Sequence, residues 1–112
     1  MIDWKRVTQL RNEIGEADFA EIVILFLDEV DEVIARLRTS PDPETLAADF
    51  HFLKGSALNL GFRNFAALCQ EGETARRNND ADTRIVAKVI AAYEESRRAF
   101  LEGMDKPLKQ AS

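Results

Sequence analysis

The chain has 112 residues, enough for one compact domain of ordinary size and too few for a second. Twenty acidic residues outnumber 15 lysines and arginines, and the net charge of −5 makes nucleic acid or an anionic membrane a poor partner. There is one cysteine, no apolar stretch of the ~18 residues that a membrane span needs, and no leader with a cleavage site. We therefore expect a soluble protein of a reducing compartment, the cytoplasm.

Apolar residues recur every three to four positions, and no segment alternates apolar and polar residues as a half-buried strand would. The first half of the chain predicts a short helix over about residues 3–14, stopped by Gly15, and a long helix over about 18–39 that Asp18 can cap. The apolar rows of these two helices are Trp4, Val7, Leu10 and Ile14, and then Phe19, Ile22, Phe26, Val30, Val33 and Leu37.

The second half predicts three more helices. The third begins at about Pro43 or Glu44 and ends at Gly61, and a fourth follows over about residues 62–78. After the polar turn RNNDAD, a fifth helix fades near Gly103, and residues 104–112 are expected to be frayed. The apolar rows of the third and fifth helices are Leu46, Phe50, Leu53, Ala57 and Leu60, and then Ile85, Val89, Tyr93 and Phe100.

Four long amphipathic helices joined by short loops favour an all-α, antiparallel up-down four-helix bundle, with the short N-terminal helix packed across one end. We expect residues 1–103 to form this single domain. Met1 and the plain ends of the chain favour a free-standing protein.

His51, the only histidine, lies on the third predicted helix. At about 100° per residue, the apolar row of that helix is centred roughly 140° away from it, so the imidazole should face outward. Its neighbours on this face are mostly small, which leaves the ring above a low surface. They are Glu44, Ala47, Ala48, Lys54, Gly55 and Leu58.

This surrounding matters because a lone histidine on a helix is most often only a solvated side chain. A neutral imidazole has a nitrogen lone pair, and its phosphorylated form is a reactive phosphoryl donor. Lys54, one turn on, could neutralise phosphoryl oxygens held on the ring. Glycine costs stability inside a helix, so Gly55 makes sense only if another protein must come close, and Ala47 and Ala48 support the same clearance.

The segment HFLKGSALNLG closely resembles the signature of histidine-containing phosphotransfer (Hpt) domains. The resemblance extends to ADFAEIVILFLDEVDEVIARL, which is similar to the second helix of the family, and to FAALCQEGE, which is similar to the helix packed beside the histidine. It covers about residues 2–100.

This resemblance implies a phosphorelay intermediate, without kinase activity of its own, in which His51 carries the phosphoryl group. The implied donor is a receiver-domain aspartate or a sensor histidine kinase, and the acceptor is the receiver aspartate of a response regulator. Lys54 resembles the phosphate-pairing lysine of the family, and Glu73 lies where a polar side chain often touches the histidine. Gly72 departs from the family, which usually has a bulky apolar residue there, and this leaves the packing of the fourth helix open.

We expect a monomer with no metal or cofactor of its own, whose receiver partner supplies a divalent metal such as Mg²⁺. Partner contacts are expected at Ala47, Ala48, Gly55 and Leu58.

Other functions fit the residues less well. An autonomous kinase would need a Gly-rich nucleotide-binding segment and a second domain. In the dimerising hairpin of kinases an acidic residue follows the histidine and a proline comes five on, whereas this chain has Phe52 and Ser56. One histidine and one cysteine cannot supply a zinc site, and Cys69 is expected to be a small buried residue. The alternative that stays open is a helical adaptor that binds a partner through its apolar patch without being phosphorylated.

Overall fold

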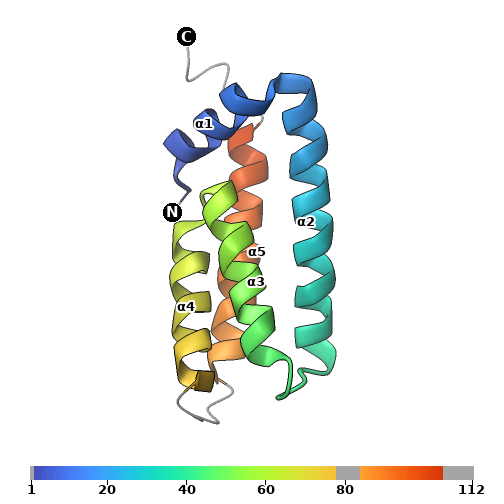
Figure 1. Ribbon diagram of the computed structural model, residues 1–112, viewed down its shortest axis with the longest axis vertical. Coiled ribbons are helices and arrows are strands. Elements are labelled where there is room, and N and C mark those ends of the chain that lie inside the picture. Colours follow the sequence, from blue (N-terminus) through green and yellow to red (C-terminus); the bar gives the residue numbers. More distant parts are fainter. Residues whose placement is uncertain (1, 78–83, 105–112) are drawn as a thin grey trace.

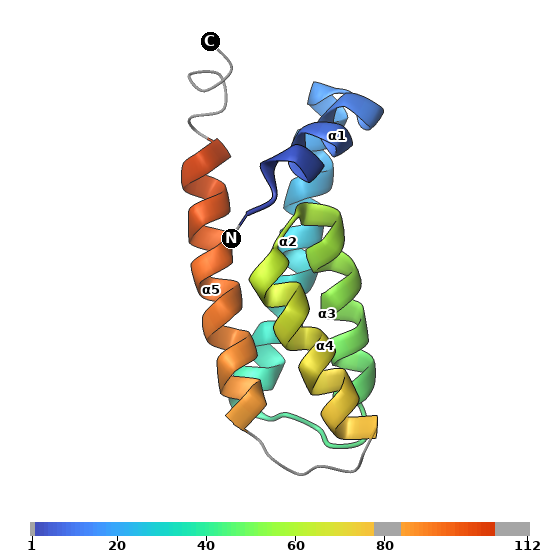
Figure 2. The same cartoon turned by 90° about the vertical axis from the view of Figure 1, so that its left-hand side faces the viewer.

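The computed structural model describes residues 2–77 and 84–104 (Figure 1). Within these ranges the chain forms helices and no strand, and the helices are α1 (Trp4–Ile14), α2 (Glu16–Thr39), α3 (Leu46–Leu60), α4 (Arg63–Arg77) and α5 (Arg84–Met104). Helices α2 to α5 alternate in direction and α1 crosses one end, which Figure 2 shows from the side. The predicted all-α bundle is therefore confirmed. Of the predicted frayed segment 104–112, Met104 is helical as the last residue of α5, and 105–112 lie outside the described residues. Most of the predicted polar turn also lies outside them.

Two helix starts differ from the predictions. The long helix begins at Glu16, directly after Gly15, whose positive φ of 86° turns the chain out of α1. Asp18 therefore lies in the first turn of α2, and its predicted capping role is wrong. Helix α3 begins at Leu46 and not at 43 or 44, because residues 43–45 form a turn in which the Glu44 N–H donates to Asp42 Oδ1 over 2.9 Å.

The core lies between the helices, and the predicted row of α3 is entirely buried. On α2 the most buried positions are partly different from the prediction, since Ile22, Phe26 and Val33 lie at the half-buried edge. The apolar arc of α2 is wider than one row, and packing against α1, α3 and α5 selects which row is deepest. The buried residues of α2 are Phe19, Val23, Leu27, Val30, Ile34 and Leu37.

Aromatic packing fixes α1 on the end of the bundle. The Trp4 ring stacks on Phe100 of α5, with ring centroids 5.8 Å apart and planes 4° from parallel. It also covers Gly103, where a Cβ atom would lie 2.0 Å from Trp4 Cζ2. Because Gly103 has no side chain, the Trp4 ring can occupy the space beside the end of α5.

Helix α4 is continuous past Gly72, which settles the point that the family resemblance left open. Gly72 is buried, and the ring of Phe50 on α3 lies against it. A Cβ atom at position 72 would lie only 2.7 Å from Phe50 Cε2. The phenylalanine thus occupies the space that a bulky side chain on α4 would otherwise need.

Candidate functional site

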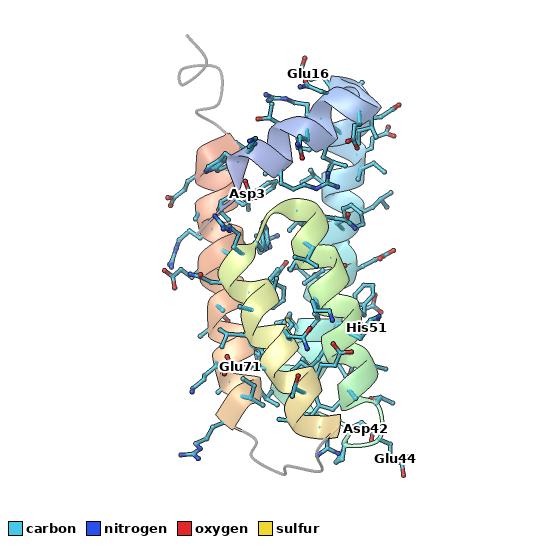
Figure 3. The ribbon with its side chains drawn as sticks, turned by 60° about the vertical axis from the view of Figure 1, so that its left-hand side comes forward. Asp3, Glu16, Asp42, Glu44, His51 and Glu71 are labelled. Carbon is cyan, nitrogen blue, oxygen red and sulfur yellow. The ribbon has the colours of Figure 1, made fainter. Side chains whose placement is uncertain are left out.

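His51 lies near the middle of α3 and points away from the bundle, as Figure 3 shows. Its side chain is 69% exposed, whereas the residue before it, Phe50, is completely buried. The predicted outward orientation is therefore confirmed, and the helical period alone accounts for it.

A carboxylate on the neighbouring helix bridges the histidine and a lysine. Nδ1 of His51 lies 2.9 Å from Oε2 of Glu73 on α4, and Nζ of Lys54 donates to the other oxygen, Oε1, over 2.8 Å. Three of the residues that the sequence singles out, His51, Lys54 and Glu73, therefore meet at one place, although α3 and α4 supply them from separate segments.

Sequence reasoning missed two further members of this cluster. Lys54 Nζ also donates to Oε1 of Gln70 over 2.9 Å, and Nε2 of Gln70 donates to the Thr74 hydroxyl over 3.1 Å. A signal was present, because Gln70 lies three residues before Glu73 and so shares its face of α4. Gln70 and Glu73 together hold the Lys54 ammonium beside α4.

The electrostatics of Glu73 determine which ring nitrogen carries the proton. The hydrogen bond from Lys54, with a further one from His51, lowers the pKa of Glu73 below its ordinary value. Glu73 is thus a carboxylate near neutral pH, and a carboxylate can only accept hydrogen bonds. The contact with His51 therefore requires the proton on Nδ1, which leaves the lone pair of a neutral ring on the outer nitrogen, Nε2.

The surface around the ring is low. A Cβ atom added at Gly55 would meet nothing within 4 Å, and Ala48 is exposed while Ala47 is half-buried. Leu58, two turns after His51, is 58% exposed. The four residues predicted to meet a partner thus all belong to α3, and the space above Gly55 is open.

The one cysteine, Cys69, does not take part in the chemistry of this cluster. Cys69 is fully buried, as predicted, and burial, with Glu73 as the second cause, raises the pKa of its thiol to about 12. A thiol with that pKa is protonated near neutral pH and is a poor nucleophile.

Within residues 2–77 and 84–104, no group of three or more histidine, cysteine, aspartate or glutamate side chains is placed to hold a metal ion. None of the helices in these ranges is long and apolar enough to cross a membrane.

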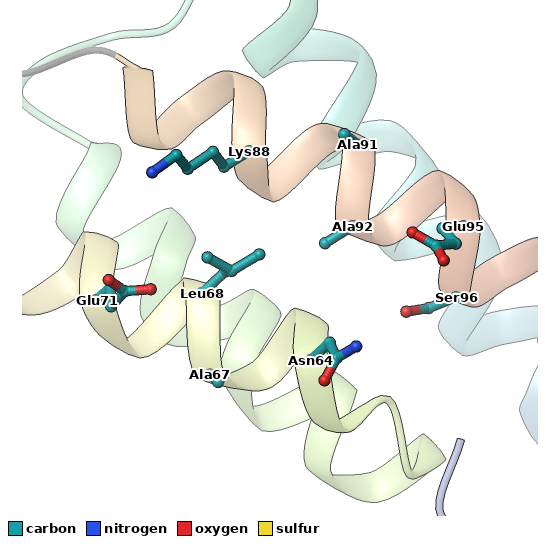
Figure 4. A pocket seen from close by; sticks show the side chains of 9 residues that line it. All are labelled: Asn64, Ala67, Leu68, Glu71, Lys88, Ala91, Ala92, Glu95 and Ser96. Carbon is teal, nitrogen blue, oxygen red and sulfur yellow. The ribbon is translucent and has the colours of Figure 1, made fainter. Parts of the chain in front are cut away.

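A groove of about 470 Å³ lies between α4 and α5 (Figure 4). Leu68 of α4 and Ala92 of α5 point into the space between the two helices, and Glu71 of α4 and Lys88 of α5 also line it. Figure 3 shows Glu71 and His51 on different sides of the α3–α4 pair. The groove is therefore separate from the histidine, and the cluster around His51 is the candidate functional site.

The sequence matches the family described as Hpt domain over residues 21–104, which extend from the first turns of α2 to the end of α5. The chain belongs to the Hpt domain family. No curated protein and no solved structure matches it significantly. Helix α1 precedes the matched residues.

Membership of this family gives the broad function. An Hpt domain takes part in phosphotransfer in two-component signalling, interacts with receiver domains and histidine kinases, and is a phosphocarrier without kinase activity of its own.

Proposed function

We propose that this Hpt domain is a phosphorelay intermediate that carries its phosphoryl group on Nε2 of His51. It accepts the group from a receiver-domain aspartate or a sensor histidine kinase, and it passes the group to the receiver aspartate of a response regulator. One observation carries the proposal: Glu73 engages Nδ1 of a 69% exposed imidazole, which leaves Nε2 as the ring nitrogen for nucleophilic attack.

The transfer step follows from this arrangement. The Nε2 lone pair attacks the phosphorus of the donor's aspartyl phosphate, the N–P bond forms, and the bond from phosphorus to the carboxylate oxygen breaks. Nδ1 keeps its proton, so the phosphorylated ring becomes positive, and the Glu73 carboxylate at 2.9 Å stabilises that charge. In the next transfer the acceptor carboxylate attacks the phosphorus, and the electron pair of the N–P bond returns to Nε2.

Lys54 has a second role in this scheme. In the unphosphorylated protein its ammonium is shared between Glu73 and Gln70, at 2.8 and 2.9 Å. An ammonium has three donors, so Lys54 can turn one of them toward a phosphoryl oxygen on the adjacent turn. We propose that it offsets the negative charge of the phosphohistidine.

The partner completes the site. We propose that the receiver domain brings the aspartate together with a divalent metal such as Mg²⁺, and that it docks over Ala47, Ala48, Gly55 and Leu58. The exposed Leu58 supplies apolar contact, and the open space above Gly55 lets the aspartyl phosphate reach the ring. We further propose that the carrier acts as a cytoplasmic monomer.

Incubation with a phosphorylated receiver domain tests the proposal. The wild type should acquire an acid-labile, alkali-stable phosphate, whereas His51→Gln should acquire none and yet melt like the wild type, because the side chain is exposed. Acid-labile labelling that persists in His51→Gln would overturn the assignment. Receiver binding without any labelling of the wild type would favour the adaptor function instead.

A further inference from the structure

We infer that Gly72 is a positioning residue for the phosphohistidine site. It lets the Phe50 ring lie directly on the backbone of α4, and this contact holds α4 at the distance and register that bring Glu73 to His51. The inference deepens the proposed role of His51 and rests on it for its functional meaning, but the geometry can be tested without any phosphotransfer.

The two contacts occupy consecutive positions on both helices. Phe50 touches Gly72, and the next residue on each helix, His51 and Glu73, form the 2.9 Å contact across the same interface. The first contact is buried and apolar, and the second is polar and faces solvent. Because a helix is stiff over one residue, any displacement of α4 at Gly72 is passed on to Glu73.

The Phe50 ring cannot make room for a larger residue. Three of its carbons would lie 2.7, 2.8 and 2.9 Å from a Cβ atom at position 72, whereas ordinary contact begins at 3.4 Å. The ring is completely buried in the core, where neighbours surround it. Because these distances fall 0.5–0.7 Å short of ordinary contact, an alanine at 72 would force the Phe50 ring and α4 apart at this point.

A displacement of this size is enough to break the polar contact. The distance from Nδ1 to Oε2 is 2.9 Å, and hydrogen bonds to nitrogen donors weaken beyond about 3.2 Å. Without the hydrogen bond to Glu73, the neutral imidazole no longer favours the tautomer that carries its proton on Nδ1. Some rings then carry it on Nε2, where the lone pair is no longer available for attack.

The chain offers a matched control at the far end of the bundle. Gly103 of α5 is also packed under an aromatic ring, since a Cβ atom there would lie 2.0 Å from Trp4 Cζ2. Gly103→Ala thus overpacks a helical glycine against an aromatic side chain as Gly72→Ala does, but far from His51. Both variants should lose stability, and only Gly72→Ala should change the histidine.

Nitrogen NMR of the imidazole, at a pH where the ring is neutral, is the first measurement. We expect wild type and Gly103→Ala to show the Nδ1–H form, and Gly72→Ala to lose this preference. The double variant Phe50→Leu/Gly72→Ala, in which a smaller side chain frees space for the new methyl group, should recover it. Should Gly72→Ala fail to fold, the double variant still tests the inference.

The second measurement is the rate at which phosphoramidate, a small phosphoryl donor that needs no docking surface, labels His51. It should fall in Gly72→Ala and recover in the double variant. A wild-type tautomer ratio in folded Gly72→Ala, or a folded double variant without the Nδ1–H preference, would overturn the inference. By contrast, a wild type that shows the expected tautomers but is never labelled by phosphoramidate or by a phosphorylated receiver would overturn the proposed function and leave the geometry intact.

Discussion

Gly55 and Gly72 lie inside neighbouring helices of one pair, yet their surroundings are opposite. Gly55 is on the outer surface of α3, where an added Cβ atom would meet nothing within 4 Å. Gly72 is on the inner surface of α4, where the same atom would lie 2.7 Å from a buried aromatic carbon. Each glycine costs about 0.8–1.0 kcal/mol of helix stability relative to alanine.

The two glycines differ in what offsets their cost in helix stability. At Gly72 it is offset inside the molecule, because the glycine admits the Phe50 ring to the α3–α4 interface. At Gly55 an added Cβ atom would meet nothing within 4 Å, and the proposed function assigns the benefit to a partner that approaches His51. Gly72 thus serves packing, and we propose that Gly55 serves access.

The largest expected effect tests the packing side of this comparison. Phe50→Ala should lower the free energy of unfolding by about 3–5 kcal/mol, because it leaves a cavity in the core. Gly72 has no side chain that could move into that cavity. Urea unfolding measures the change, and a loss well below about 3 kcal/mol would show that the Phe50–Gly72 contact is not a main source of stability.

The next prediction tests the access side. Gly55→Gln should be as stable as the wild type or more stable, by up to about 1 kcal/mol, because it removes a helical glycine without creating a clash. Phosphoryl transfer from a receiver should nevertheless be markedly slower, since the new side chain obstructs docking, and Gly55→Ala should be intermediate.

Thermal melts and transfer kinetics on the same samples measure both quantities. Ala20→Gln, on the exposed side of α2, is a suitable control for adding a glutamine to a helix surface. If Gly55→Gln transferred phosphoryl at the wild-type rate, the glycine would not be there for partner access.

The smallest expected effect concerns Glu73, the residue that follows Gly72, and the pH dependence of stability. Lys54, and then His51, lower the pKa of Glu73 in the folded protein, so its ionised form adds stability at pH values above the ordinary glutamate pKa of about 4.3. That stability is lost as the pH falls through the lowered folded-state pKa.

Urea unfolding over a series of acidic pH values should therefore show a shallower loss of stability in Glu73→Gln than in the wild type. Glu71→Gln, which removes a carboxylate from the α4–α5 groove on the same helix, is the matched control. Identical pH slopes for wild type and Glu73→Gln would mean that the carboxylate contributes nothing through these bonds.

The sequence predicts the buried row of α3 better than that of α2. Leu46, Phe50 and Leu53 on α3 are buried as predicted, because they recur at the three- and four-residue spacing of one helix face. On α2 apolar residues spread over a wide arc, and the period cannot tell whether Ile22 or Val23 lies deeper. Only packing against three other helices decides it.

The candidate site was predictable in part for similar reasons. The outward position of His51 and its sharing of a face with Lys54 follow from the helical period. Contacts between helices do not, so the role of Glu73 came from the family resemblance, and Gln70 was missed. The Phe50–Gly72 contact next to this site was not predictable either, because a glycine by itself reveals nothing about what lies against it.

Trp4 is the only tryptophan of the chain, and its ring is sandwiched where α1 crosses the end of α5. His51 lies near the middle of α3, away from that end (Figure 3). Intrinsic fluorescence excited at the indole therefore reports whether α1 is docked on the end of α5, and it does so without a label. Since His51 is not part of this contact, the same optical signal can follow unfolding of the protein in both its free and its phosphorylated form.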